Sequence, residues 1–205
     1  MTTMDIIRRT KAAWRSIHTM TAEDKSRLLQ SMAESLQRHT DEILRCNALD
    51  MDAARGKISD VMLDRLRLDA ARIDAMADGV RAVAQLPDHT GRILSEVQRP
   101  NGMTIYKKQV PLGLVAIIYE SRPNVTSDAA ALAIKSGNVC VLRSGRDAIR
   151  SAKAITAALK EGITAAGGDA DILNILEDTS HESANELMRA KGLVDLLIPR
   201  GGAGR

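Results

Sequence analysis

Residues 1–87 carry apolar side chains at the spacing of an amphipathic helix. Leu28, Met32 and Leu36 recur every four positions, and Ile43 continues the same stripe. This periodicity holds throughout the segment, whereas the alternation of a half-buried strand is missing from it. The pattern therefore predicts a leading region of helices.

Capping signals mark where these helices begin. Thr21 is followed three residues later by Asp24, an arrangement that resembles a capping box. Ser59 and Asp69 each precede a further apolar run and are candidate N-caps. Gly56 is expected to end the first helical region, so the segment divides into several helices.

Residues 92–110 change character and predict a protruding β-hairpin. Two extended runs flank Pro100-Asn101-Gly102, and Asn-Gly is a strong short-range hairpin signal. A hairpin outside the main sheet leaves an unpaired edge that another subunit could cover. We therefore expect this segment to serve oligomerisation.

Residues 111–205 alternate strands with helices. The apolar runs predict strands at Leu114–Tyr119, Val139–Arg143, Ile172–Leu176 and Leu193–Ile198, and helices at about Val125–Ser136, Asp147–Glu161 and Ser180–Ala190. Gly137, Gly162 and Gly192 stand just beyond these helices, where a left-handed C-cap is favoured. Strands without polar alternation, joined by helices, predict an α/β fold with a parallel sheet buried on both faces.

The loop after the first of these strands holds chemically active side chains. In a parallel sheet the carboxyl ends of all strands share one rim, where ligands bind. The loop contains Glu120, Ser121, Arg122 and Asn124, a set that can hold an anion or stabilise an oxyanion. The simpler interpretation is that Asn124 and Thr126 cap the helix while Glu120 pairs with Arg122.

Two further loops on this rim are candidates for phosphate binding. The loop after the second strand holds Arg143, Ser144, Gly145 and Arg146, and guanidinium groups at a helix N-terminus suit a phosphate. A surface loop with Arg146 paired to Asp147 is the alternative. The loop after the fourth strand holds Arg200, Gly201, Gly202 and Gly204, which could form a nest for a diphosphate or be a frayed tail.

Composition narrows the classes of function. The net charge of +3 is mild and basic residues are scattered, and there are only three aromatic residues, so nucleic-acid binding is not expected. The run Val110–Tyr119 is about half of a membrane span, and no signal-peptide pattern opens the chain, so we expect a cytoplasmic protein with no membrane contact. No Cys/His spacing suggests a metal site.

A catalytic nucleophile is missing from the predicted rim. Cys140 lies within an apolar strand, where a cysteine is usually an inert small hydrophobe, and Cys46 lies in the helical region. None of the four histidines is placed to activate a nucleophile, and no Ser/His/Asp arrangement is present.

Two motifs make the chain resemble the gamma-glutamyl phosphate reductases, or glutamate-5-semialdehyde dehydrogenases, of the aldehyde dehydrogenase superfamily. These are Tyr-Glu-Ser-Arg-Pro-Asn-Val from Tyr119 and Ile-Pro-Arg-Gly-Gly-Ala-Gly from Ile198, and the similarity runs from about Ala12 to Gly204. The resemblance implies a Rossmann-type, aldehyde-dehydrogenase-like fold. It also implies NADPH-dependent reduction of L-glutamate 5-phosphate to the 5-semialdehyde, with release of phosphate, in L-proline biosynthesis.

The resemblance also assigns roles to the three loops. Residues 143–147 match the family loop near the adenosine end of NADP(H), residues 200–204 match the turn beside its diphosphate, and residues 120–124 match the loop facing the substrate. Either Arg122 or Asn124 would serve as the oxyanion donor. The family usually reads Arg-Gly-Gly-Lys-Glu where this chain has Arg143-Ser144-Gly145-Arg146-Asp147, which leaves the preference for NADPH over NADH open.

The family's nucleophilic cysteine would follow Arg205. We therefore expect residues 1–205 to be the N-terminal portion of an NADP-binding domain, without the catalytic domain and inactive alone. The alternative is a non-catalytic nucleotide-binding or assembly module. A homo-oligomer and an association with glutamate 5-kinase are further expectations.

Overall fold

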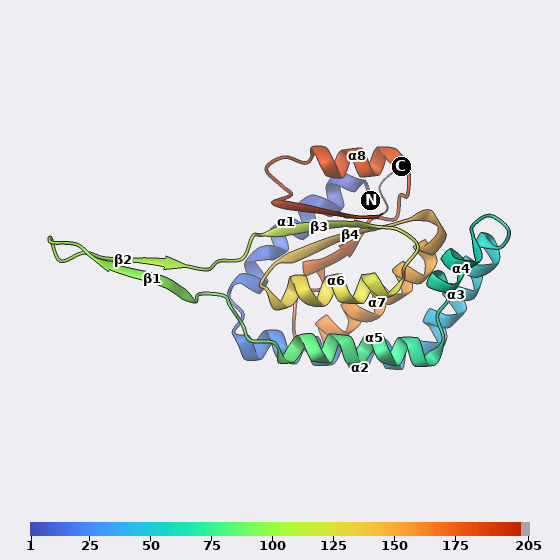
Figure 1. Cartoon of the computed structure of the whole chain (residues 1–205), viewed down its shortest axis with the longest axis horizontal. Helices are drawn as coiled ribbons and strands as arrows, with labels where there is room; N and C mark the ends of the chain where they lie inside the picture. Colours follow the sequence, from blue (N-terminus) through green and yellow to red (C-terminus); the bar gives the residue numbers. More distant parts are fainter. Residues whose placement is uncertain (202–205) are drawn as a thin grey trace.

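The computed structural model describes residues 1–201 and has the predicted α/β fold with a parallel sheet. Its strand order is β5-β4-β3-β6, and all neighbouring strands are parallel (Figure 1). The strands are β3 (Leu114–Tyr119), β4 (Val139–Ser144), β5 (Leu173–Ile175) and β6 (Leu196–Arg200). The fourth strand begins at Leu196 rather than at Leu193.

Helices cover both faces of this sheet. Their bounds are α1 (Thr3–His18), α2 (Ala22–Arg38), α3 (Thr40–Ala54), α4 (Asp60–Leu66), α5 (Ala70–Gln85), α6 (Asn124–Lys135), α7 (Ile149–Ala165) and α8 (His181–Arg189). Helices α6 and α7 lie on one face, and α1 and α8 lie on the other (Figure 1). Helices α2 and α5 form a further layer over α6 and α7, so the leading helices are integral to the α/β unit.

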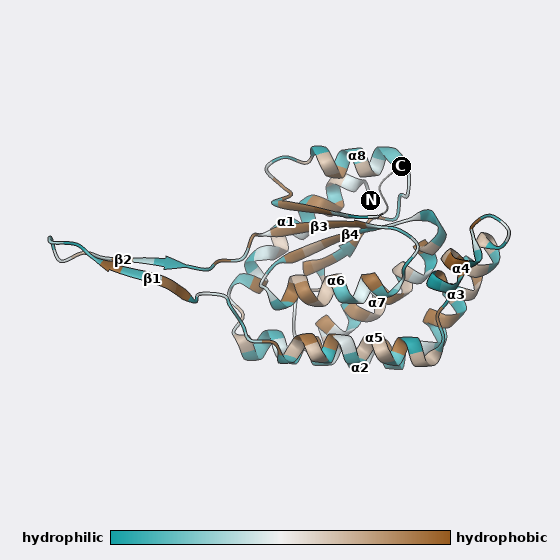
Figure 2. Ribbon diagram, in the orientation of Figure 1, coloured by the Kyte–Doolittle hydropathy of each residue, from teal (hydrophilic) through white to brown (hydrophobic). Residues whose placement is uncertain are grey.

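One hydrophobic core joins the leading helices to the sheet. Leu28, Met32, Leu36 and Ile43 are all buried in it, as the periodicity predicts. Strands β3 and β4 are the hydrophobic centre of the molecule in Figure 2. The stripe is nevertheless interrupted at His39, where the sequence pattern gave no sign that α2 ends and α3 begins.

The predicted N-caps are confirmed in the structure. Thr21 and Asp24 form a complete capping box at the start of α2, with each side chain accepting from the other residue's backbone N–H. Ser59 accepts from the backbone N–H of Met62 at the start of α4. Asp69 likewise accepts from Arg72 at the start of α5.

The prediction that Gly162 is a helix C-cap is wrong. Helix α7 continues to Ala165, and the left-handed residue after it is Gly167, with φ of 80°. Gly162 lies inside the helix where α7 crosses α2, and a Cβ there would be 2.6 Å from the Cα of Met32. Close approach of two helices, and not termination of one, explains this glycine.

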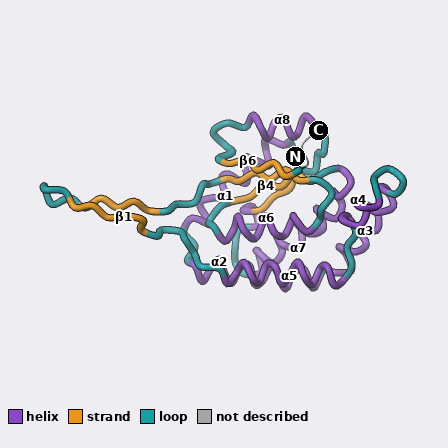
Figure 3. Tube along the Cα trace, viewed as in Figure 1, coloured by secondary structure: helices purple, strands orange, loops and turns teal. Residues whose placement is uncertain are grey.

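Residues 92–110 form the predicted hairpin, which extends away from the body (Figure 3). Strands β1 (Ile93–Gln98) and β2 (Thr104–Lys108) pair antiparallel, and Gly102 between them has φ of 82°. Almost every hairpin residue is exposed, including Ile93, Val97 and Ile105. In residues 1–201 no helix is long and apolar enough to cross a membrane.

Candidate functional site

The carboxyl ends of three strands meet at one level of the sheet. Tyr119 at the end of β3 is in register with Ser144 of β4 and with Arg200 of β6. The chain runs from β3 outward to β4 and β5, then returns to place β6 on the other side of β3. The topological switch point, where open α/β sheets bind ligands, therefore lies between β3 and β6.

The loop that follows β3 turns sharply into α6. The backbone N–H of Arg122 donates to the carbonyl of Glu120 at 2.6 Å, and that of Val125 donates to the carbonyl of Arg122 at 3.1 Å. Pro123 is the N-cap residue, and no side chain caps α6. The first N–H groups of α6 therefore lack a side-chain acceptor at the rim.

The simpler capping interpretation of this loop is wrong. Thr126 is buried and its hydroxyl bonds to the hydroxyl of Tyr119 at 2.7 Å, and the amide of Asn124 donates to Asp128 at 3.4 Å. Neither side chain caps the helix. Within residues 1–201, Glu120 and Arg122 form no ion pair.

The loops after β3 and β4 pack directly on one another. The hydroxyl of Ser121 donates to a carboxylate oxygen of Asp147 at 3.1 Å. A Cβ on Gly145 would lie 3.4 Å from the Cα of Glu120, so the two loops approach one another to van der Waals distance. Arg146 is exposed, and in the described part of the chain it forms no ion pair with Asp147. The guanidinium of Arg146 is available to a ligand.

Arg143 and Ser144 differ from Arg146 in that their side chains have partners within the chain. A terminal nitrogen of Arg143 donates to the carbonyls of Thr179 and Ser180 at 2.8 and 3.1 Å, which fixes the turn before α8. Burial lowers the pKa of this guanidinium, and its buried Nε has no hydrogen-bond partner in residues 1–201. The Ser144 side chain is fully buried and donates to the carbonyl of Gly145.

Arg200 and Gly201 complete the rim on the far side of β3. A Cβ on Gly201 would lie 3.0 Å from a carboxylate oxygen of Glu120, so the two loops on either side of the switch point are in contact. Gly202 and Gly204, which the sequence also assigns to this turn, lie outside the described residues.

A pocket of about 410 Å³ opens beside the loop after β3. It lies between the segment joining α4 to α5 and the first turns of α6, and its polar lining consists of Asp64, Arg65, Arg67, Arg72, Arg122, Asn124 and Asp128. Arg122 and Asn124 were predicted as site residues, whereas the others were not. One signal was available for Asp128, because it is the single acidic residue in the otherwise alanine-rich helix α6.

Asp128 has an unusual environment within this pocket. Burial raises the pKa of its carboxyl group above the ordinary value, and the nearby charge of Arg200 and the bond from Asn124 oppose that rise only in part. The charge of Arg200, at the end of β6, therefore acts on a carboxylate of this pocket.

Neither cysteine lies at the rim. Cys140 is the second residue of β4, near the end of the strand opposite the rim; it is fully buried, and burial raises the pKa of its thiol to about 12. Burial and the carboxylate of Glu42 also raise the pKa of Cys46, which is in α3. A reactive thiolate is favoured by a lowered pKa, so neither thiol has the environment of an activated cysteine.

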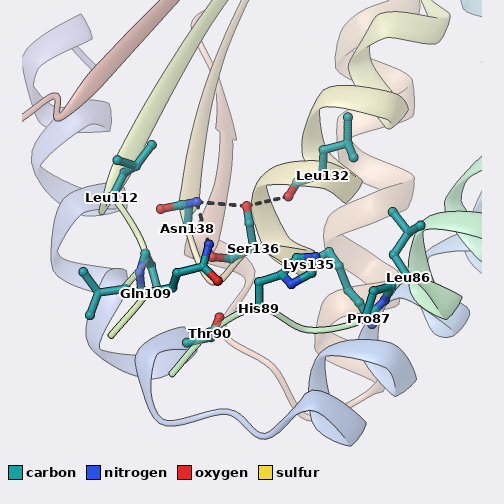
Figure 4. A pocket seen from close by; sticks show the side chains of 12 residues that line it. Leu86, Pro87, His89, Thr90, Gln109, Leu112, Leu132, Lys135, Ser136 and Asn138 are labelled. Atoms are coloured by element: carbon teal, nitrogen blue, oxygen red, sulfur yellow. Dashed lines mark hydrogen bonds between the residues drawn. The ribbon is translucent and has the colours of Figure 1, made fainter. Parts of the chain in front are cut away.

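A second pocket, of about 470 Å³, lies at the opposite end of the sheet where the hairpin joins the body (Figure 4). Lys135 lines it, but the ammonium group donates to the carbonyl of Ala84 at 2.7 Å and to Ser26 at 3.0 Å. Asn138 donates to Ser136 and accepts from the backbone N–H of Gly113. Lys135 and Asn138 thus connect structural elements, whereas the buried Oε1 of Gln109, which also lines this pocket, has no hydrogen-bond partner within residues 1–201.

Comparisons with known proteins identify the class to which this fold and rim belong. The aldehyde dehydrogenase family profile matches residues 2–198, and the chain belongs to that family. The resemblance to gamma-glutamyl phosphate reductases is confirmed within it. The chain is 58% identical over 194 residues to gamma-glutamyl phosphate reductase of Neisseria gonorrhoeae, a match that covers 95% of this chain and 46% of the relative.

Two solved structures of proteins with the same name agree with this relationship. Gamma-glutamyl phosphate reductase of Thermotoga maritima superposes with a TM-score of 0.96 at 34% identity, covering 98% of this chain and 49% of that one. The enzyme of that name from Saccharomyces cerevisiae gives a TM-score of 0.88 at 25% identity, covering 99% and 52%. This chain thus spans about half the length of the relatives it matches.

Proposed function

We propose that this chain forms the cofactor-binding portion of a gamma-glutamyl phosphate reductase, an enzyme of L-proline biosynthesis. The reaction is reduction of L-glutamate 5-phosphate by NADPH to L-glutamate 5-semialdehyde, with release of phosphate. The observation that carries this proposal is the 58% identity to a relative of that name, in a chain whose Glu120 and Gly201 loops meet at the switch point.

The residues on the rim fit NADP(H). The bound cofactor would supply the hydride. Arg146 is exposed at the start of the short 3-10 helix Arg146–Ala148, where no side chain caps the N-terminus, so it suits the 2′-phosphate of NADP(H). Gly145 and Gly201 permit close approach of the backbone to the cofactor. Arg143 would act indirectly, by fixing the turn before α8.

Asn124 is the better candidate for the oxyanion donor. Its side-chain amide lies at the first residue of α6, where no side chain caps the first N–H groups. An oxyanion near this point would receive hydrogen bonds from the amide and be favoured by the helix dipole. Arg122 is exposed in the same loop, and we assign it a different role below.

The cysteine that attacks the acyl phosphate in this family has no counterpart among the two cysteines here. We therefore expect the 205-residue chain to bind NADPH without oxidising it when glutamyl phosphate is added. Fluorescence titration measures the binding, and absorbance of NADPH measures turnover. Oxidation of NADPH by the pure chain would contradict the assignment of the chemistry to residues outside it.

A charge-reversed variant tests the cofactor site. Arg146→Glu is expected to weaken NADPH binding by about tenfold or more and to affect NADH much less, because a charged contact to the 2′-phosphate is lost. Arg99→Glu, at the exposed hairpin, is the matched control. If the chain binds neither nucleotide, the alternative of an assembly module is favoured.

We also propose that the hairpin holds subunits together. Ile93, Val97 and Ile105 are exposed on it, and a two-stranded hairpin without a covering partner is marginal in water. Ile105→Lys is expected to shift an oligomer toward monomer in sedimentation velocity experiments, with Lys108→Gln, on the other face of the hairpin, as the control. An unchanged oligomer would exclude this face of the hairpin as the interface.

The remaining assignments follow from the proposed enzyme. A biosynthetic reductase with small-molecule substrates would operate in the cytoplasm. An association with glutamate 5-kinase would limit the escape of the labile acyl phosphate that the kinase forms and the reductase uses. Co-purification of the kinase with this protein measures that association.

A further inference from the structure

The pocket between α4, α5 and α6 holds charges of both signs. Arg122 and Asn124 reach it from the loop after β3, Arg65 comes from α4, and Asp128 comes from α6. Its apolar lining is limited to Leu68, Ala75 and Met76. A concave site with opposed charges suits a small zwitterion better than it suits an apolar or purely anionic ligand.

Some of these charges already have partners within the chain. Arg72 donates to the carbonyls of Asp64 and Arg67 at 2.6 and 2.7 Å and to the Asp64 carboxylate at 3.0 Å, which holds the segment from α4 to α5 in place. Arg67 lies 3.6 Å from the same carboxylate. Arg72 and Arg67 therefore shape the wall of the pocket.

Two guanidinium groups in the pocket remain for a ligand. Arg122 and Arg65 are both exposed, and within residues 1–201 neither forms an ion pair. Arg122 lies in the loop between β3 and α6 and lines the same pocket as Asn124, the proposed oxyanion donor. A carboxylate at this point would receive charge-assisted hydrogen bonds, which are stronger than neutral ones.

Asp128 supplies the opposite charge. Its carboxylate is half-buried, accepts a long bond of 3.4 Å from Asn124, and forms no ion pair in the described part of the chain. A Cβ on Gly79 of α5 would lie 3.8 Å from one of its carboxylate oxygens, so at this position the facing helix has no side chain beside Asp128. A ligand ammonium group would compensate this partly desolvated carboxylate.

We propose that this pocket binds the α-amino-acid end of the substrate, with Arg122 and Arg65 contacting the α-carboxylate and Asp128 contacting the α-ammonium group. The inference rests on the proposed function, since it takes the substrate to be a glutamyl phosphate. It explains how the enzyme selects an amino acid over a simple dicarboxylic acid, because a dicarboxylic acid has no ammonium group to compensate the charge of Asp128.

Three ligands separate the two contacts. L-Glutamate carries both groups, glutarate lacks the ammonium group, and 4-aminobutyrate lacks the α-carboxylate. We expect the 205-residue chain to bind L-glutamate at least about tenfold more tightly than either analogue in NMR titrations, since each loses a charged contact. Absence of saturable L-glutamate binding, or equal affinity for all three ligands, overturns the proposal.

Two variants assign the contacts to residues. Asp128→Asn is expected to weaken the binding of L-glutamate and of 4-aminobutyrate by about tenfold, because both ligands carry the ammonium group. The binding of glutarate is not expected to weaken. Arg122→Gln is expected to weaken the binding of L-glutamate and of glutarate and to leave the binding of 4-aminobutyrate unchanged. Glu34→Gln and Arg15→Gln, at exposed positions of α2 and α1, are the matched controls. A variant that changes all three affinities equally overturns its assigned contact.

These titrations contain no nucleotide, so their outcome is independent of the cofactor test. Loss of NADPH binding with intact selection of L-glutamate would refute the proposed function and retain the pocket. NADPH binding without selection of L-glutamate would refute the proposed role of the pocket and retain the proposed function.

Discussion

Replacing Gly162 with alanine is expected to lower the free energy of unfolding by about 2–3 kcal/mol. The new methyl group would lie 2.6 Å from the Cα of Met32 and 2.6 Å from the carbonyl oxygen of Ser31, both of them backbone atoms. A flexible side chain could move aside, but backbone cannot do so without separating α7 from α2. Chemical denaturation followed by circular dichroism measures the change.

Gly79→Ala is the matched control, because Gly79 also lies inside a helix. Its nearest neighbour would be a carboxylate oxygen of Asp128 at 3.8 Å, an ordinary contact distance. Alanine there is expected to stabilise the chain by about 0.5–1 kcal/mol through its better helix propensity. Equal effects of the two substitutions would show that α7 and α2 are not in close contact at Gly162.

Gly162 also shows where local sequence patterns fail. A glycine near the end of a periodic apolar run looks the same in the sequence whether it ends the helix or allows a second helix to pack closely against it. The N-caps at Thr21, Ser59 and Asp69 were predicted because each cap is made within three residues. The break at His39 was missed because no glycine, proline or capping side chain marks it.

The candidate site likewise has a part that the sequence predicts and a part that it does not. The meeting of the loops after β3, β4 and β6 could be predicted, since parallel strands place their carboxyl ends on one rim. The directions of individual side chains could not. Arg143 donates to the turn before α8, and Arg65 and Arg72 reach the rim from α4 and α5, which precede β3 by some distance in the sequence.

Asp50 is another residue whose role depends on a distant part of the chain. It lies near the end of α3, is fully buried, and accepts hydrogen bonds from the backbone N–H and the hydroxyl of Ser151 at 2.8 and 2.7 Å. It also accepts from Arg150 at 3.3 Å. A carboxylate from α3 therefore caps α7, directly after the loop that holds Arg146.

Asp50→Ala is expected to lower the free energy of unfolding by about 3 kcal/mol. The substitution leaves two buried donors of Ser151 without an acceptor, and each unsatisfied donor costs roughly 1–3 kcal/mol. It also removes a negative charge from the N-terminus of α7. Chemical denaturation measures the loss, and Asp50→Asn, which keeps one acceptor oxygen, is expected to give a smaller one.

Asp52→Ala on the same helix is the control for Asp50→Ala. Asp52 is exposed and lies 3.8 Å from Arg55, so its loss is expected to change stability by less than about 0.5 kcal/mol. Because Asp50 fixes the start of α7, Asp50→Ala is also expected to weaken NADPH binding at Arg146 under conditions where the variant remains folded. Comparable stability of the two variants would contradict the cap, whereas a destabilised variant with unchanged NADPH affinity would show that the cap does not position the cofactor loop.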